Sequence, residues 1–69
     1  MRRYLVIVEK EQGAFSAYTP DLPGCIGVGT TVDEAERAVF AALQMHLEGM
    51  RVDNVAIPPN ASLAEYLLV

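Results

Sequence analysis

Two side chains in the sequence have the chemistry of a nucleophile and its base. The 69-residue chain contains one cysteine, Cys25, and one histidine, His46, and a thiol activated by an imidazole is a common catalytic pair. Cys25 follows a Pro-Gly pair, however, and His46 lies in the middle of an apolar helical pattern. We therefore expect a packed thiol and a core or interface imidazole, with a catalytic pair as the lesser alternative. One cysteine and one histidine also fall short of the usual four zinc ligands, so we predict no metal and no cofactor.

A group of acidic residues is the second candidate for chemistry, because converging carboxylates can hold a catalytic metal ion. Thr31-Val32-Asp33-Glu34 matches a capping box, in which the threonine and the glutamate satisfy free amides at a helix start. Asp33 also lies where the helix dipole favours negative charge. These effects explain Asp33 and Glu34 without catalysis, and Glu36 is expected at a solvated rim or in an interface.

The charge of the chain bears on its partners. Nine acidic residues against five basic ones leave a net charge of −4, and the only basic pair is Arg2-Arg3. An acidic surface repels phosphate backbones and favours basic protein partners. We therefore predict no direct binding of nucleic acid by this domain. The longest apolar stretches are too short to span a bilayer, and the N-terminus has no secretory pattern, so the expected location is cytoplasmic, without a membrane.

Hydrophobic periodicity predicts the elements that must position these residues. Short β-branched or alternating runs separated by Gly and Pro indicate strands, and a capped run with a 3.6-residue period indicates a helix. The expected fold is α+β, an antiparallel sheet of three to four strands with one main helix on one face. The predicted strands cover residues 4–8, 14–19, 25–29 and, in preference to a short helical tail, 65–69; the helix covers 32–48, with Gly49 as a left-handed cap.

The helix has an apolar face and a second apolar strip on its flank. The core face is predicted to consist of Val32, Ala35, Val39, Ala42, Leu43 and His46, packed closely over Gly27 and Gly29. Phe40 and Leu47 form the flanking strip, which exceeds the needs of one small core. Hydrophobic residues make up 52% of the chain, more than a monomer of this size can bury. We therefore expect a homo-oligomer, either a dimer or a tetramer.

Several motifs together resemble the HicB family of bacterial antitoxins. The first is Pro20-Asp21-Leu22-Pro23-Gly24-Cys25, which follows the hairpin. The second is the helix start Thr31-Val32-Asp33-Glu34-Ala35, and the later ones are Leu47-Glu48-Gly49 and Ile57-Pro58-Pro59. The resemblance covers about residues 4–60, and the combination of the first two motifs is more specific than either alone.

This resemblance implies a fold, a partner and a domain organisation. The implied fold is a partial ribonuclease-H-like β-β-β-α-β arrangement without nuclease chemistry, formed by residues 1–69 as a single HicB-like domain. The implied partner is a HicA-type toxin, a small basic mRNA interferase that the antitoxin neutralises by direct contact. Many members also carry a C-terminal helix-turn-helix or ribbon-helix-helix domain, which this chain, ending at Val69, is expected to lack.

From the residues expected to be exposed, we predict a non-catalytic interface for the partner. It consists of Pro20, Asp21, Leu22, Pro23, Asp33, Glu36, Phe40 and Leu47. Two alternatives remain: a solitary homo-oligomeric HicB-like protein with no toxin partner, and a residual nuclease or hydrolase on the ribonuclease-H-like fold.

Overall fold

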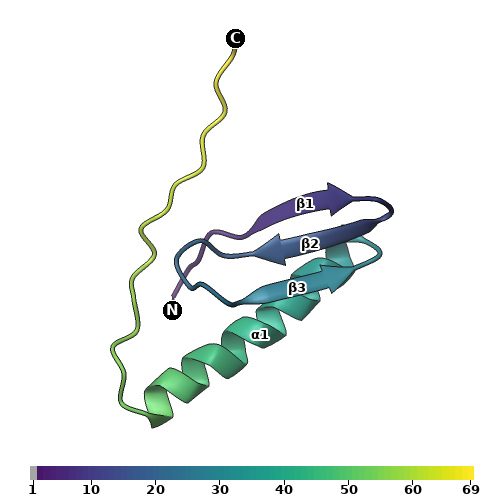
Figure 1. Ribbon diagram of the computed structural model, residues 1–69. Helices are drawn as coiled ribbons and strands as arrows, with labels where there is room; N and C mark the ends of the chain where they lie inside the picture. The colour runs from purple at the N-terminus through teal and green to yellow at the C-terminus, as the bar shows by residue number, and fades with distance from the viewer. Residues whose placement is uncertain (1) are drawn as a thin grey trace.

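A computed structural model describes residues 2–69 as a three-stranded antiparallel sheet followed by one long helix (Figure 1). The strands are β1 (Ile7–Glu11), β2 (Ala14–Tyr18) and β3 (Ile26–Gly29), and they lie in the order β1-β2-β3. The helix α1 (Val32–Val52) covers one face of the sheet. The predicted α+β architecture with one main helix is thus confirmed, with three strands. No helix within residues 2–69 is long and apolar enough to cross a membrane.

A two-residue turn connects β1 and β2. Glu11 pairs with Ala14, and the residues between them, Gln12 and Gly13, have φ angles of 38° and 80°. Positive φ at both positions is typical of the type I′ turn, whose twist matches that of the flanking strands. Because the turn is so tight, β1 continues through Glu11, where the sequence predicted a loop. Charged residues are well tolerated there, since β1 is an edge strand exposed to solvent.

The helix lies unusually close to β3. A Cβ atom added to Gly27 would meet the backbone nitrogen of Val39 and would lie 2.6 Å from the carbonyl oxygen of Ala35. A Cβ atom on Gly29 would lie 2.7 Å from the backbone nitrogen of Ala35. Only glycine permits such an approach. The predicted packing of the helix over these two glycines is therefore confirmed.

The buried core is small. Its central cluster consists of Ala17, Ala35 and Val39, with Val6, Val8 and Phe15 packed against it. Other predicted members of the core face differ, because both His46 and Val32 are exposed. The close approach of the helix at β3 places Ala35 and Val39 against the sheet, whereas Val32 and His46 lie on parts of α1 outside this contact.

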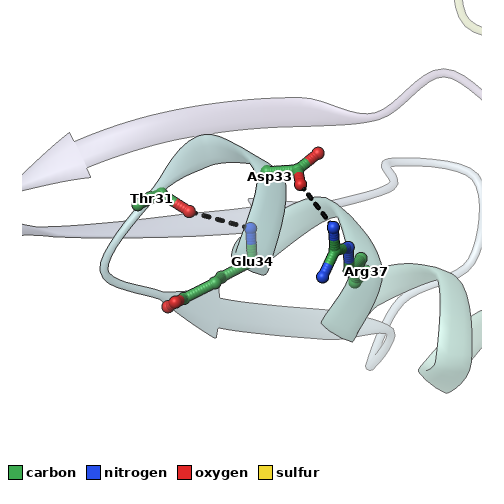
Figure 2. Close-up of polar contacts among 4 residues, drawn as sticks. All are labelled: Thr31, Asp33, Glu34 and Arg37. Carbon is green, nitrogen blue, oxygen red and sulfur yellow. Dashed lines mark hydrogen bonds and ion pairs between the residues drawn. The ribbon is translucent and has the colours of Figure 1, made fainter.

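The start of α1 agrees with the predicted cap. The Thr31 hydroxyl accepts a hydrogen bond from the Glu34 amide at 3.1 Å, as Figure 2 shows. The Glu34 carboxylate in turn accepts hydrogen bonds from the amide and the hydroxyl of Thr30, both at 2.8 Å. These bonds hold the pKa of Glu34 below its usual value of 4.5. The free amides at the helix start are thereby partly satisfied.

The end of α1 differs from the prediction. Gly49 lies inside the helix, which continues for another turn to Val52. The left-handed residue is Asn54, with φ of 57°. The Asn54 amide donates to the Arg51 carbonyl at 3.2 Å, and the Val55 amide donates to the Met50 carbonyl at 2.9 Å. This pattern is a Schellman motif, in which asparagine can replace glycine.

The segment after α1 forms neither helix nor strand. The predicted strand over residues 65–69 is wrong for the described chain, because the segment runs away from the sheet and has no strand beside it (Figure 1). Its first half, in contrast, lies against the chain start, where the Tyr4 hydroxyl donates to the Pro58 carbonyl at 2.6 Å. The apolar pattern of residues 65–69 is therefore not accompanied by pairing with a strand of the same chain.

Candidate functional site

A groove between β1 and α1 is lined largely by apolar side chains. It has a volume of about 480 Å³ and is lined by Val6, Val8, Asp33, Glu36, Arg37, Val39, Phe40 and Leu43. Its origin is the asymmetric position of the helix: Gly27 and Gly29 draw α1 towards β3, at one edge of the sheet. β1, at the opposite edge, is left partly uncovered. We call this feature the β1–α1 groove.

Charged side chains line one end of the β1–α1 groove. Asp33 and Arg37 form an ion pair at 2.8 Å (Figure 2), and both side chains are largely exposed. Such a pair contributes little to stability in water. Glu36 is also exposed and forms no ion pair within residues 2–69. At this end of the groove, the charge of Asp33 is therefore compensated by Arg37, whereas the charge of Glu36 is not.

Phe40 and Leu47 lie along the same flank of α1, two turns apart. The Phe40 side chain is 60% exposed, whereas Leu47 is half-buried. A large aromatic ring with this exposure has much apolar surface to offer a partner. The predicted flanking strip is therefore present as an exposed surface, with Phe40 as its larger member.

The Pro20–Gly24 loop lies elsewhere and is mostly occupied by its own chain. Leu22 is only 2% exposed and belongs to the core. The Asp21 carboxylate accepts hydrogen bonds from the amides of Ala61 and Ser62, each at 3.1 Å, and from the Ser62 hydroxyl at 3.0 Å. Desolvation raises the pKa of Asp21, but these hydrogen bonds outweigh it, so the pKa lies below the usual 3.8. Pro20 and Pro23 remain exposed.

The structure thus divides the predicted interface into two parts. Asp33, Glu36 and Phe40 line one groove, and the exposed residues of the loop, Pro20 and Pro23, are not among its lining residues. The sequence reasoning missed Val6, Val8 and Leu43 as members of the groove. The sequence shows that these residues are apolar. That they line an open groove follows only from the displacement of α1 towards β3.

A second exposed apolar surface lies on the sheet face opposite the helix. Strand pairing aligns Ile7 with Tyr18 and Tyr18 with Ile26, so these three side chains form one row across the sheet. Ile26 and Val28 are 59% and 63% exposed. The sequence correctly predicted that Ile26 and Val28 share a face opposite the glycines. This outer face is uncovered because the single helix occupies the other side.

The residues considered for catalysis are not gathered into a metal site. Cys25 is buried, and desolvation raises the pKa of its thiol, which reduces the thiolate needed for nucleophilic attack. His46 is exposed on α1. Within residues 2–69, no three side chains of His, Cys, Asp or Glu lie close enough together to hold a metal ion. The expected packed thiol is therefore observed, whereas the imidazole is in solvent.

The family comparison adds to this geometry. A family model described as HicB-like antitoxin of bacterial toxin-antitoxin system matches residues 4–68. The sequence motifs that resembled this family lie within the matched region. No solved structure matches the chain, so the ribonuclease-H-like relation remains an expectation from the sequence.

Curated relatives come from distant sources. An uncharacterized 14.9 kDa protein from the rep-hol intergenic region of Haemophilus phage HP1 is 31% identical over 64 residues, which cover 93% of this chain and 48% of that protein. A UPF0150 protein of Thermoplasma acidophilum is 35% identical over 57 residues, covering 81% of this chain and 83% of the relative. A UPF0150 protein of Synechocystis is 32% identical over 56 residues, covering 80% of this chain and 71% of the relative. The chain spans about half the length of the phage relative.

Proposed function

The chain belongs to the HicB-like antitoxins of bacterial toxin–antitoxin systems, and from this membership we propose that it neutralises a small basic toxin of the HicA type by direct contact. The observation that carries the proposal is the family match over residues 4–68. In this role the chain acts as a binding module and performs no catalysis itself. Its target is an mRNA interferase, whose access to RNA it blocks.

The charge of the chain supports this role. A protein that binds RNA needs a basic surface to neutralise phosphates. The antitoxin has a net charge of −4, so it attracts such a surface and competes with RNA for it. Complementary charge also accelerates encounter and disfavours wrong partners.

We place the toxin contact at the charged end of the β1–α1 groove and on the neighbouring strip. Asp33 and Glu36 supply negative charge there, and Phe40 and Leu47 supply apolar surface on the same helix. Asp33 is paired with Arg37 at 2.8 Å, so a toxin cation must share or replace Arg37. Glu36 has no such competitor among the described residues and is expected to make the larger contribution to binding.

The test is a binding titration with the purified HicA-type protein encoded beside the antitoxin gene. Asp33→Ala and Glu36→Ala together should weaken binding by about twofold to thirtyfold at low salt, since exposed charge pairs contribute about 0.2–1 kcal/mol each. The difference should shrink as salt is raised. Asp53→Ala is the matched control, because Asp53 is an exposed acid at the far end of α1. Equal affinities for all three proteins would remove this surface from the interface.

One alternative function has a specific observation in its favour. The exposed apolar surfaces are also suited to a homo-oligomer that has no toxin partner, because isolated monomers rarely expose large contiguous apolar patches. Absence of any short reading frame for a basic protein beside the gene would favour this alternative. Toxin binding by the wild-type chain would refute it.

A further inference from the structure

The outer face of the sheet has a second row of side chains beside the apolar row described above. Strand pairing aligns Glu9 with Ser16 and Ser16 with Val28, so these three residues share the outer face, two residues away from the apolar row along each strand. Glu11 and Ala14 are the next aligned pair on this face. The outer face is therefore acidic along β1 and apolar along β3, on either side of short side chains on β2.

The short side chains of β2 leave a hollow near the hairpin turn. It has a volume of about 710 Å³ and is lined by Glu11, Gln12, Ala14, Phe15, Ser16 and Val28. Ala14 and Ser16 are half-buried, whereas Glu11 is exposed on one side of them and Val28 is 63% exposed on the other. The hollow, which we call the outer-face trough, therefore has a floor of short side chains between an acidic wall and an apolar wall.

The carboxylates of the acidic wall are not compensated on their own face. Glu9 and Glu11 are exposed and form no ion pair within residues 2–69. Lys10 lies between them in the sequence, but the alternation of the strand turns it to the helix side, where its ammonium nitrogen lies 5.9 Å from the centre of the Phe15 ring. The remaining basic residues precede β1 or lie on α1: Arg2, Arg3, Arg37 and Arg51. The outer-face positions of the three strands therefore carry carboxylates and no cation.

This arrangement is complementary to a lysine or arginine side chain. Such a side chain combines an apolar stem with a charged end. The stem can lie on the floor of the trough against Val28, while the charged end reaches Glu9 and Glu11. The hydroxyl oxygen of Ser16, on the floor, is a further acceptor for a hydrogen bond. A phosphate or a carboxylate would instead be repelled by the two glutamates, which disfavours nucleic acid and acidic peptides as occupants.

The charge of the chain also bears on whether a second copy occupies the trough. The net charge of −4 makes two copies repel each other. Arg37 and Arg51 each bind a carboxylate of their own helix, so a copy that offered either one would first have to break that ion pair. Both observations favour a different protein, with a net positive charge, over a second copy.

We propose that the outer-face trough binds a lysine or arginine side chain from an extended segment of a basic protein. In an extended segment, residues two positions apart point to the same side, so an apolar residue two positions from the basic one lies on Tyr18 and Ile26, in the neighbouring row. This surface is separate from the toxin contact proposed above, because α1 covers the opposite face of the sheet (Figure 1). The proposal does not depend on that contact.

The test is a titration of the isotope-labelled chain with a short peptide, followed by nuclear magnetic resonance at low salt. The probe is the blocked pentapeptide Ser-Leu-Ser-Arg-Ser at millimolar concentration, and its control contains citrulline, which has the shape of arginine without the charge. The arginine peptide should shift the amide signals of Ala14, Ser16 and Val28 in a saturable way, since these residues line the trough. The citrulline peptide should bind at least twofold more weakly, and added salt should remove the difference.

Two double variants separate the trough from the general charge of the chain. Glu9→Gln/Glu11→Gln should weaken binding of the arginine peptide by about twofold to thirtyfold, whereas Glu36→Gln/Asp53→Asn removes the same net charge from α1 and its C-terminal cap and should leave binding unchanged. Absence of saturable shifts, equal affinities for the two peptides, or equal weakening by both variants would overturn the proposal. So would the same shifts on concentrating the chain alone, because the occupant would then be a second copy.

Discussion

The close packing of α1 on β3 makes a quantitative prediction for Gly27→Ala. The added methyl group would meet the Val39 nitrogen and lie 2.6 Å from the Ala35 carbonyl oxygen and 2.7 Å from the Ala38 carbonyl carbon. All three atoms belong to the helix backbone, so no side chain can rotate away. The whole helix must move from the sheet, and the core of Ala17, Ala35 and Val39 opens with it.

The expected cost of Gly27→Ala lies at the upper end of overpacking changes, about 3 kcal/mol. A chain of this length has a total free energy of unfolding of about 3–10 kcal/mol, so the loss is a large fraction of it. At about 4–8 °C per kcal/mol for a domain of this size, the midpoint of thermal unfolding should fall by about 12–24 °C.

Gly49→Ala provides the matched control for this experiment. No atom lies within 4 Å of the added Cβ position at Gly49, and the residue is inside α1. Alanine is the better helix former, so the variant should be more stable by about 0.5–1 kcal/mol. Both variants are unfolded by heat and by urea at the same protein concentration, because association would shift the apparent stability. The reasoning is refuted if Gly27→Ala unfolds within about 0.5 kcal/mol of the wild-type chain.

Three further predictions concern the helix ends and acid stability. Thr31→Ala removes the acceptor for the Glu34 amide and should cost about 1 kcal/mol in urea unfolding; an unchanged midpoint would contradict the cap. Asn54→Gly should leave stability unchanged or slightly higher, because φ of 57° suits glycine, whereas Asn54→Val should cost about 1–2 kcal/mol; equal stabilities would contradict the Schellman motif. The pKa values of Asp21 and Glu34 lie below their usual 3.8 and 4.5, so their stabilisation is present above about pH 4.5 and is lost as the pH falls through the lowered pKa values. Asp21→Asn and Glu34→Gln should flatten this acid loss in a urea series from pH 7 to 3, and a wild-type midpoint independent of pH over this range would contradict it.

Local signals in the sequence predicted much of the fold. The Thr31–Glu34 cap, the alternation of apolar residues and glycines in β3, and the amphipathic pattern of α1 are each determined within a few residues. For this reason the helix start and the packing face of β3 were predicted correctly. The sequence also predicted that the Pro20–Gly24 loop is ordered. It did not indicate that Leu22 is buried or that the Asp21 carboxylate binds residues 61–62.

The errors occur where distant parts of the chain decide the outcome. Gly49 suits a cap, yet the helix continues because the Asn54 motif five residues later satisfies its last carbonyls. Residues 65–69 have an apolar strand pattern, but a strand needs a neighbour, which pattern alone does not supply. The β1–α1 groove depends on how far Gly27 and Gly29 displace the helix, so its lining by Val6 and Leu43 follows only from the packed structure.

The most direct measurement of the central claim is an mRNA cleavage assay with the HicA-type protein encoded beside the antitoxin gene. The toxin is incubated with an mRNA substrate alone and with increasing amounts of the chain, with the Asp53→Ala variant as a second inhibitor preparation. Neutralisation by direct contact predicts that cleavage falls to background near equimolar amounts of both inhibitors. Cleavage that continues at full rate in the presence of a tenfold excess of the wild-type chain would contradict the account.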